Sequence, residues 1–309
     1  MINFRYHVVS LTAVFLALAI GLVVGTAALN GPVADNLQAQ VTALSKDNSN
    51  FRDQANQYRD ELNRAQDFAT QVSPALLNGQ LAGRRLLIVA LPGSQDYVGG
   101  VVSMLTVAGA KITAKVTVQD KFFDPGSNTD LLDAAMEASQ PTASVAGLPQ
   151  NSDGVETSSA LLALALQQRT PEVSALDVTA VLAAYTKLGF LAVDKGALGG
   201  AEGTVVVSGL PPVDKDAAKK NQSAVTLTTQ FAKEKPLVVA GTGIGDGNLV
   251  GEIRGDPTLV KSISTVDDVT TTQGQLATAL AVVERVVQNK IGQYGLQSGA
   301  TSLVPKATG

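Results

Sequence analysis

Cysteine and tryptophan are absent from the 309-residue sequence, and histidine occurs once, at His7. Without cysteine the chain can form neither a disulfide nor a thiolate nucleophile. Because His7 precedes the first long apolar run, the rest of the chain lacks the imidazole that Ser-His-Asp systems, Cys-His systems and HExxH zinc sites require. A Ser-Lys dyad or a carboxylate pair would still be available. These absences favour a protein that is not an enzyme and that carries no cofactor.

Aromatic residues and positive charge are also scarce. Aromatic residues make up 4% of the sequence, and the formal net charge is −4. A nucleic-acid-binding surface normally carries a basic patch, and a platform for bases or sugars needs exposed aromatic rings. We therefore expect no nucleic-acid partner.

One long apolar run is present near the start, where residues 8–29 carry no charge. As a helix this run would span about 33 Å, against about 30 Å for the hydrocarbon core of a bilayer. It is longer than the apolar region of a secretory signal, which is typically about 7–15 residues. Cleavage after Thr26-Ala27-Ala28 remains an alternative, and a buried core helix is a weaker one. The run predicts a membrane anchor whose apolar side chains include Val8, Phe15, Leu16, Leu18, Ile20, Leu22, Val23 and Val24.

The charges that flank the apolar run predict its orientation. Arg5 precedes the run, and the first charged residue after it is Asp35. By the positive-inside rule, residues 1–7 lie in the cytoplasm and the bulk of the chain is exported into the envelope. A single helical span fits a cytoplasmic membrane.

Residues 30–73 carry an apolar stripe with unbroken four- and three-residue spacing, which is typical of a coiled coil. Its d positions are Leu37, Leu44, Phe51, Tyr58, Ala65 and Val72, and its a positions are Val41, Asn48, Ala55, Leu62 and Ala69. A polar residue at one a position, Asn48, fixes register in parallel dimers, and Asp47 at g would face Arg52 at e of a partner. We expect a parallel homodimer. The alternatives are a single amphipathic helix packed on its own domain and a coil completed by a partner protein.

From residue 84 the pattern changes to alternating apolar strands and helices. Ser73-Pro74 is expected to end the preceding helix. Strands are predicted over 86–91, 111–118, 204–209 and 236–241. Helices are predicted over 97–108, 130–138, 158–168, 175–193, 214–234 and 274–294. Because strands that are apolar on both faces are typical of parallel sheets covered by helices, residues 84–294 predict an α/β domain with an open, mostly parallel sheet. Residues 124–159 are expected to be largely irregular, and the tail 295–309 to be disordered.

Two polar motifs could carry chemistry. Asp267-Asp268 is a carboxylate pair, but adjacent side chains point apart and the pair precedes a helix, so turn and cap roles are favoured over catalysis. GTGIGDGN, residues 241–248, follows an apolar strand but lacks the Rossmann spacing and the Walker lysine. It could be a crossover loop with Asp246 as a helix cap. Since open α/β sheets bind ligands at the carboxyl ends of their strands, a small-ligand site near Leu91 and Gly241 remains an alternative.

Several segments resemble one protein family. They are INFRYHVVSLTAVFLALAIGLVVG at the start, LLIVALPG, STVDDV with QGQLATALAVVE, and GQYG. These segments are similar to the actinobacterial MctB family, the mycobacterial copper transport protein B family, over essentially the whole chain apart from the tail. The resemblance implies an envelope protein in copper efflux or copper homeostasis, described as an outer-membrane channel. The same family carries the name SteB, which implies a dimeric partner for the membrane protein SteA in the control of peptidoglycan hydrolysis during cell division.

The residues themselves offer little for copper. Copper(I) prefers cysteine and methionine sulfur and copper(II) prefers imidazole, whereas the exported part supplies only Met104 and Met136. A copper ligand therefore follows from the resemblance alone. A barrel channel would need many alternating strands, and the sequence instead shows one helical span and apolar strands. The coiled coil favours a scaffold or signal relay that acts through a partner.

Overall fold

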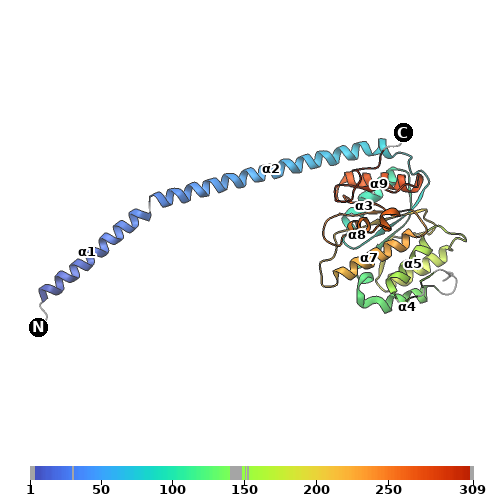
Figure 1. Cartoon of the computed structure of the whole chain (residues 1–309), viewed down its shortest axis with the longest axis horizontal. Helices are drawn as coiled ribbons and strands as arrows, with labels where there is room; N and C mark the ends of the chain where they lie inside the picture. Colours follow the sequence, from blue (N-terminus) through green and yellow to red (C-terminus); the bar gives the residue numbers. More distant parts are fainter. Residues whose placement is uncertain (1–3, 30, 140–147, 150, 152, 307–309) are drawn as a thin grey trace. The chain divides into compact units, whose positions relative to one another are not determined.

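The structure, a computed structural model, describes residues 4–29, 31–139, 148, 149, 151 and 153–306. The chain divides into two units, Met1–Arg64 and Ala65–Gly309. The first holds helix α1, Phe4–Leu29, and most of helix α2, Pro32–Leu77. The second is an α/β domain (Figure 1).

Seven strands form one sheet in the order β3-β2-β1-β4-β5-β6-β7. All neighbouring strands are parallel except β2 and β3, which are antiparallel. The strands are β1 Arg85–Ala90, β2 Lys111–Val118, β3 Leu191–Val193, β4 Gly203–Val207, β5 Leu237–Ala240, β6 Ser264–Val266 and β7 Gln293–Tyr294. The predicted open, mostly parallel sheet is confirmed.

Helices cover both faces of this sheet, as the two-sided apolar strands require. The α-helices are α3 Gln95–Val107, α4 Asn128–Ala138, α5 Gly154–Leu166, α6 Ala175–Lys187, α7 Ala217–Ala232, α8 Leu249–Gly255 and α9 Thr272–Val287. Three short 3-10 turns are η1 Asp120–Phe123, η2 Pro125–Ser127 and η3 Leu259–Lys261. The side chains of β1 alternate between the two layers. Leu87 and Val89 pack with α4 to α8, whereas Leu86 and Ile88 pack with α3 and α9.

Two helices are predicted to be longer than they are in the structure. The helix predicted over 175–193 ends at Lys187, and Leu191–Val193 forms edge strand β3. The helix predicted over 274–294 ends at Val287, and Gln293–Tyr294 forms β7. In both cases a residue with positive φ, Gly189 or Asn289, follows the last turn and ends the helical run.

The expected helix end at Ser73-Pro74 is also wrong, because α2 continues through Pro74 to Leu77. The hydroxyl of Ser73 donates to the carbonyl of Ala69 at 2.5 Å, and the backbone N–H of Asn78 donates to the carbonyl of Pro74 at 3.0 Å. Burial of Leu77 in the core holds this last turn in place.

The tail also differs from the expected disorder over its described part, residues 295–306. Gly295 donates its N–H to Ser302, and Thr301 donates its N–H to Gln293. These bonds extend the pairing of β7. The residues expected to be irregular, 124–159, hold α4 and the start of α5, and residues 140–147, 150 and 152 lie outside the described part.

Candidate functional site

A cleft of about 260 Å³ lies where β1 and β4 end. β1 is the strand at which the sheet order reverses, because β2 follows it on one side and β4 lies on the other. Ligands of open α/β sheets bind outside the carboxyl ends of the strands at such a reversal point. The cleft therefore occupies the place where this fold class keeps its binding sites.

Two glycines bring the loops after β1 and β4 into direct contact. A Cβ atom on Gly209 would lie 2.3 Å from the backbone carbonyl of Gly93, so no larger residue fits without backbone movement. Gly93 itself has φ +75°, a left-handed conformation that favours glycine. The apolar strands and this close approach together place Leu91 and Ser208 on the floor of the same cleft.

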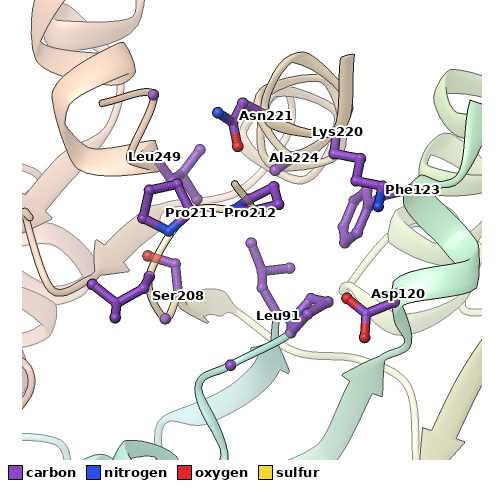
Figure 2. A pocket seen from close by; sticks show the side chains of 15 residues that line it. Leu91, Asp120, Phe123, Ser208, Pro211, Pro212, Lys220, Asn221, Ala224 and Leu249 are labelled. Carbon is purple, nitrogen blue, oxygen red and sulfur yellow. The ribbon is translucent and has the colours of Figure 1, made fainter. Parts of the chain in front are cut away.

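The cleft is lined mainly by apolar side chains, which come from five different segments. They are Leu91, Pro92, Phe123, Leu210, Pro211, Pro212, Ala224 and Leu249. Figure 2 shows Lys220, Phe123 and Asp120 on one side of the cleft and Ser208 and Leu249 on the other. The prolines fix the shape of the loop after β4, since their φ angles are locked.

Three polar groups in the cleft have no hydrogen-bond partner among the described residues. Ser208 is 6% exposed, and only its backbone N–H is bonded, to the carbonyl of Ala240. The side-chain amide of Asn221 lies beside Gly247, and the carboxylate of Asp120 is exposed at the rim. Because Ser208 lines the cleft and its hydroxyl has no partner in the described part of the chain, the hydroxyl can hydrogen-bond to a molecule in the cleft.

Lys220 is already paired. Its ammonium group lies 2.5 Å from Asp214, and this hydrogen bond raises the pKa of Lys220, with a further contribution from the charges of Asp124 and Asp120. The same hydrogen bond and one from the backbone of Asp216 lower the pKa of Asp214. Both groups are therefore charged at neutral pH. Lys215 acts on Asp214, and Asp124 and Asp120 act on Lys220, so these five groups carry three negative and two positive charges, one net negative charge.

The predicted ligand-site residues reach the cleft only in part. Leu91 lines it, whereas Gly241 lies beside Ser208 without lining it, and the loop 241–248 contributes Gly247 alone. Helix α8 does follow this loop, but its cap is Asn248, which accepts from Gly251 at 2.8 Å, and not Asp246. The loop 208–212 was missed, although a serine and glycine directly after an apolar strand, before two prolines, could have indicated it.

The carboxylate pair Asp267-Asp268 divides into two separate roles. Asp267 is fully buried and lies 2.6 Å from Arg254, and it also accepts backbone N–H groups from Leu296 and Gln297. Asp268 accepts the hydroxyl of Thr271, the residue that caps α9. Burial raises the pKa of Asp268. Asp268 has the turn role that the sequence predicts. Asp267 instead forms a structural ion pair with Arg254, which the sequence did not indicate.

Two of the segments behind the family resemblance, STVDDV with QGQLATALAVVE and GQYG, meet around Asp267. A Cβ on Gly295 would collide with the carboxylate of Asp267, and one on Gly274 would collide with the carbonyl of Asp268. Tyr294 donates its hydroxyl to Glu284. Burial and this hydrogen bond raise the pKa of Tyr294. These residues hold the carboxyl-terminal segment against the sheet.

The predicted coiled-coil residues lie along α2. Leu37, Val41, Leu44, Asn48, Phe51, Ala55, Tyr58 and Leu62 are all exposed in the single chain. We call these eight residues the heptad stripe. Beyond it, Ala69 is 3% exposed and Val72 packs against the core, so the last turns of α2 cover the α/β domain.

Helix α1 carries the predicted anchor residues, and all of them are exposed on it. Within it, Phe4–Ala27 is long and apolar enough to cross a membrane, with a mean hydropathy of 2.6. The hydroxyls of Thr12 and Thr26 donate to backbone carbonyls one turn earlier, which removes the cost of placing them in lipid.

Potential copper ligands are not gathered in the described part of the chain. It contains no cluster of three or more His, Cys, Asp or Glu side chains that could hold a metal ion. Met104 is buried on α3, on one face of the sheet, whereas Met136 is exposed on α4, which covers the other face. The two sulfur atoms therefore cannot bind one ion together.

The apolar helix α1 fits, by its length and composition, a membrane-associated protein that carries an α/β domain with a strand-end cleft. A family model described as "Copper transport outer membrane protein, MctB" matches residues 1–305. The chain belongs to this family.

Relatives support the same assignment along the full length. "Copper transporter MctB" of Mycobacterium tuberculosis (strain ATCC 25618 / H37Rv) and that of Mycobacterium bovis are each 28% identical over 312 residues. The protein of that name in Mycobacterium leprae is 27% identical over 319 residues. Each alignment covers 98% of this chain and 99% of the relative. The names of these relatives describe transport proteins and not enzymes.

Proposed function

We propose that this protein is a single-pass, non-enzymatic membrane protein that contributes to copper efflux and copper homeostasis across the cell envelope. In this proposal α1 is retained as the anchor, residues 1–7 are cytoplasmic and the α/β domain is exported. The protein acts as a parallel homodimer, paired through the heptad stripe. Family membership supports the link to copper, and the charges of Arg5 and Asp35 support the orientation.

The exposed heptad stripe is the observation that carries this proposal. Leu44 and Phe51 are each 69% exposed and Leu62 is 47% exposed, on a helix whose other faces are polar. Burying one such side chain is worth about 1.5–3 kcal/mol, so the exposed stripe favours association. Copies that are anchored in one membrane with the same orientation can pair only in parallel.

The chemistry of the described residues favours an indirect part in copper transport. Soft sulfur ligands and imidazole are the groups that bind copper well, and the two methionines of the α/β domain lie on opposite faces of its sheet. We infer that copper is the cargo of an assembly that this dimer supports, and not a ligand of the α/β domain itself.

The test measures the copper content of cells. Cells that lack the gene receive the wild-type gene, a stripe variant (Leu44→Gln, Phe51→Gln and Leu62→Gln) or a control variant (Thr42→Gln, Ser49→Gln and Asn56→Gln). The control introduces the same residue three times at b positions, away from the stripe. We expect wild type and control to restore copper export and the stripe variant to fail at equal protein abundance.

Either of two results would count against the proposal. Unchanged copper content in cells without the gene would overturn the role in copper efflux. Full restoration by the stripe variant would overturn the need for pairing.

A second candidate function rests on the same stripe. An exposed heptad stripe can also hold a membrane partner, so the protein could work as an interaction protein with a SteA-like partner in controlling peptidoglycan hydrolysis. In copper-depleted medium, this candidate expects altered cell length and altered sensitivity to muralytic enzymes when the gene is lost. The copper proposal expects neither change in that medium.

A further inference from the structure

We propose that the cleft at the ends of β1 and β4 binds a small amphipathic amine, that is, a molecule with an apolar body and one protonated amino group. This proposal is independent of the role in copper handling. It rests on the position of the cleft, on its lining and on three polar groups that have no partner among the described residues.

The size and lining of the cleft select a small, largely apolar ligand. Its volume of about 260 Å³ lies just below the range of about 300–1,000 Å³ that is usual for small-molecule sites. Phe123, Leu249 and the pair Pro211-Pro212 form walls that would contact an apolar body. A few polar groups in an otherwise apolar pocket are the usual arrangement for fixing a ligand's orientation.

The buried serine points to a ligand that can hydrogen-bond at the floor of the cleft. Ser208 as a whole residue is 6% exposed, its hydroxyl has no hydrogen-bond partner among the described residues, and that hydroxyl lies beside Gly241. The hydroxyl can donate or accept, and the amide of Asn221 can do the same from the opposite wall. Because Ser208 lies on the side of the cleft opposite Asp120, these two groups would serve a second polar atom of the ligand and not its ammonium group.

The charges at the rim select the sign of the ligand. Asp214 neutralises Lys220 at 2.5 Å, which leaves the carboxylate of Asp120 unpaired among the described residues. Asp124 adds further negative potential near Lys220. A phosphate or carboxylate ligand would therefore be repelled, whereas an ammonium group would pair with Asp120.

The experiment uses three probes that share a fluorophenyl ring and differ in charge. They are 2-(4-fluorophenyl)ethylamine, 2-(4-fluorophenyl)ethanol and 3-(4-fluorophenyl)propionate. Binding to the full chain in detergent micelles is followed by fluorine NMR, with empty micelles as the blank. We expect the amine to bind most tightly, then the alcohol, and the carboxylate to bind least.

Four variants connect binding to the cleft. Ala224→Leu fills the cleft and should abolish binding of the amine and the alcohol. Asp120→Asn should weaken the amine roughly two- to fivefold, the range for a solvent-exposed ion pair, and leave the alcohol unchanged. Leu249→Ala, which removes part of the apolar wall, should weaken both probes. Asp67→Asn, which removes an exposed carboxylate of α2 outside the cleft, should change neither.

Three results would overturn the proposal. They are no binding of the amine above the micelle blank, equal or tighter binding of the carboxylate, and unchanged binding in a folded Ala224→Leu variant. If Ala224→Leu does not fold, Asp120→Asn decides the question, because Asp120 is exposed and its replacement leaves the core intact. An unchanged preference for the amine in Asp120→Asn would also contradict the proposal.

Discussion

Arg254 and Asp267 form the most deeply buried ion pair in the described part of the chain. Their side chains are 4% and 0% exposed. Arg254 also donates to the carbonyl oxygens of Tyr294 and Ser298 and to the hydroxyl of Thr265. Because every guanidinium nitrogen of Arg254 and both carboxylate oxygens of Asp267 are hydrogen-bonded, this pair ties α8, β6 and the carboxyl-terminal segment together.

Removing one member of this pair should be costly. Asp267→Asn leaves the guanidinium of Arg254 buried without a counter-charge, and we expect the free energy of unfolding to fall by about 3–5 kcal/mol. Urea denaturation of the full chain measures this loss. The control, Asp194→Asn, breaks the exposed pair with Lys115 and should cost less than about 1 kcal/mol. An equal fall in the free energy of unfolding in both variants would show that the buried pair stabilises the protein no more than the exposed pair does.

Glu202 predicts a pH dependence of stability. Burial tends to raise the pKa of its carboxyl group, but hydrogen bonds and charges from Arg84 and Arg85 outweigh burial and lower it. A pKa that is lower in the folded state stabilises the protein above the unfolded value of about 4.3, and this contribution disappears as the pH falls through the folded pKa.

Glu202→Gln should therefore lower the free energy of unfolding at neutral pH by up to about 1 kcal/mol, because Glu202 and both arginines are partly exposed. The difference from wild type should shrink as the pH falls below about 4.5. Chemical denaturation at several pH values measures it. Glu252→Gln, at an exposed position, is the control. A difference that does not change with pH would contradict the ion-pair explanation.

At the scale of elements, apolar strands were the part of the fold that the sequence predicted best. β1, β2, β4 and β5 each carry four or more consecutive residues that are buried or suited to strands, and all four begin and end within two residues of their predicted positions. β3, β6 and β7 have only three, three and two residues. Strands this short show no alternation of apolar and polar residues in the sequence. They are strands only because they pair with a neighbouring strand.

The sequence could predict the position of the cleft, at the ends of the parallel strands, but not the residues that line it. The rule that ligands bind at strand ends indicated Leu91, which lines the cleft, because it depends only on the end of one apolar strand. It could not show that β4 would pair with β1, because the two strands lie far apart in the sequence and the order of strands in the sheet is not written in either of them. Phe123, Lys220 and Asn221 reach the cleft from η1 and α7, and spacing in sequence does not relate these elements.

Replacing Asn48 tests how α2 associates. If the heptad stripe forms the seam of a dimer, Asn48→Leu replaces a polar seam position with an apolar one and should tighten association about tenfold or more. It should also allow species larger than a dimer, because a buried Asn restricts the oligomeric state. Sedimentation equilibrium in detergent measures both effects.

The matched control is Asn50→Leu, which makes the same change at a c position outside the seam. It should leave association unchanged. Equal behaviour of the two variants would mean that Asn48 does not face a partner.

At the scale of the whole molecule, we expect the protein to take part in copper efflux without binding copper itself. Equilibrium dialysis of the full chain in detergent, with copper(I) and copper(II) in turn, should show no tight stoichiometric site. Met104→Leu with Met136→Leu should change nothing, since the two residues lie on opposite faces of the sheet. Tight binding that this double variant removes would make copper a direct ligand of the domain.

Parallel pairing through α2 is the central claim, and the absence of cysteine makes it directly testable. A chain with the single substitution Leu44→Cys has one thiol, placed at a d position, so a mild oxidant applied to intact membranes can join two copies only where their stripes meet in register. The matched control is Thr42→Cys at a b position. The account predicts a cross-linked dimer for Leu44→Cys and almost none for Thr42→Cys. Equal cross-linking of both variants, or of neither, would contradict it.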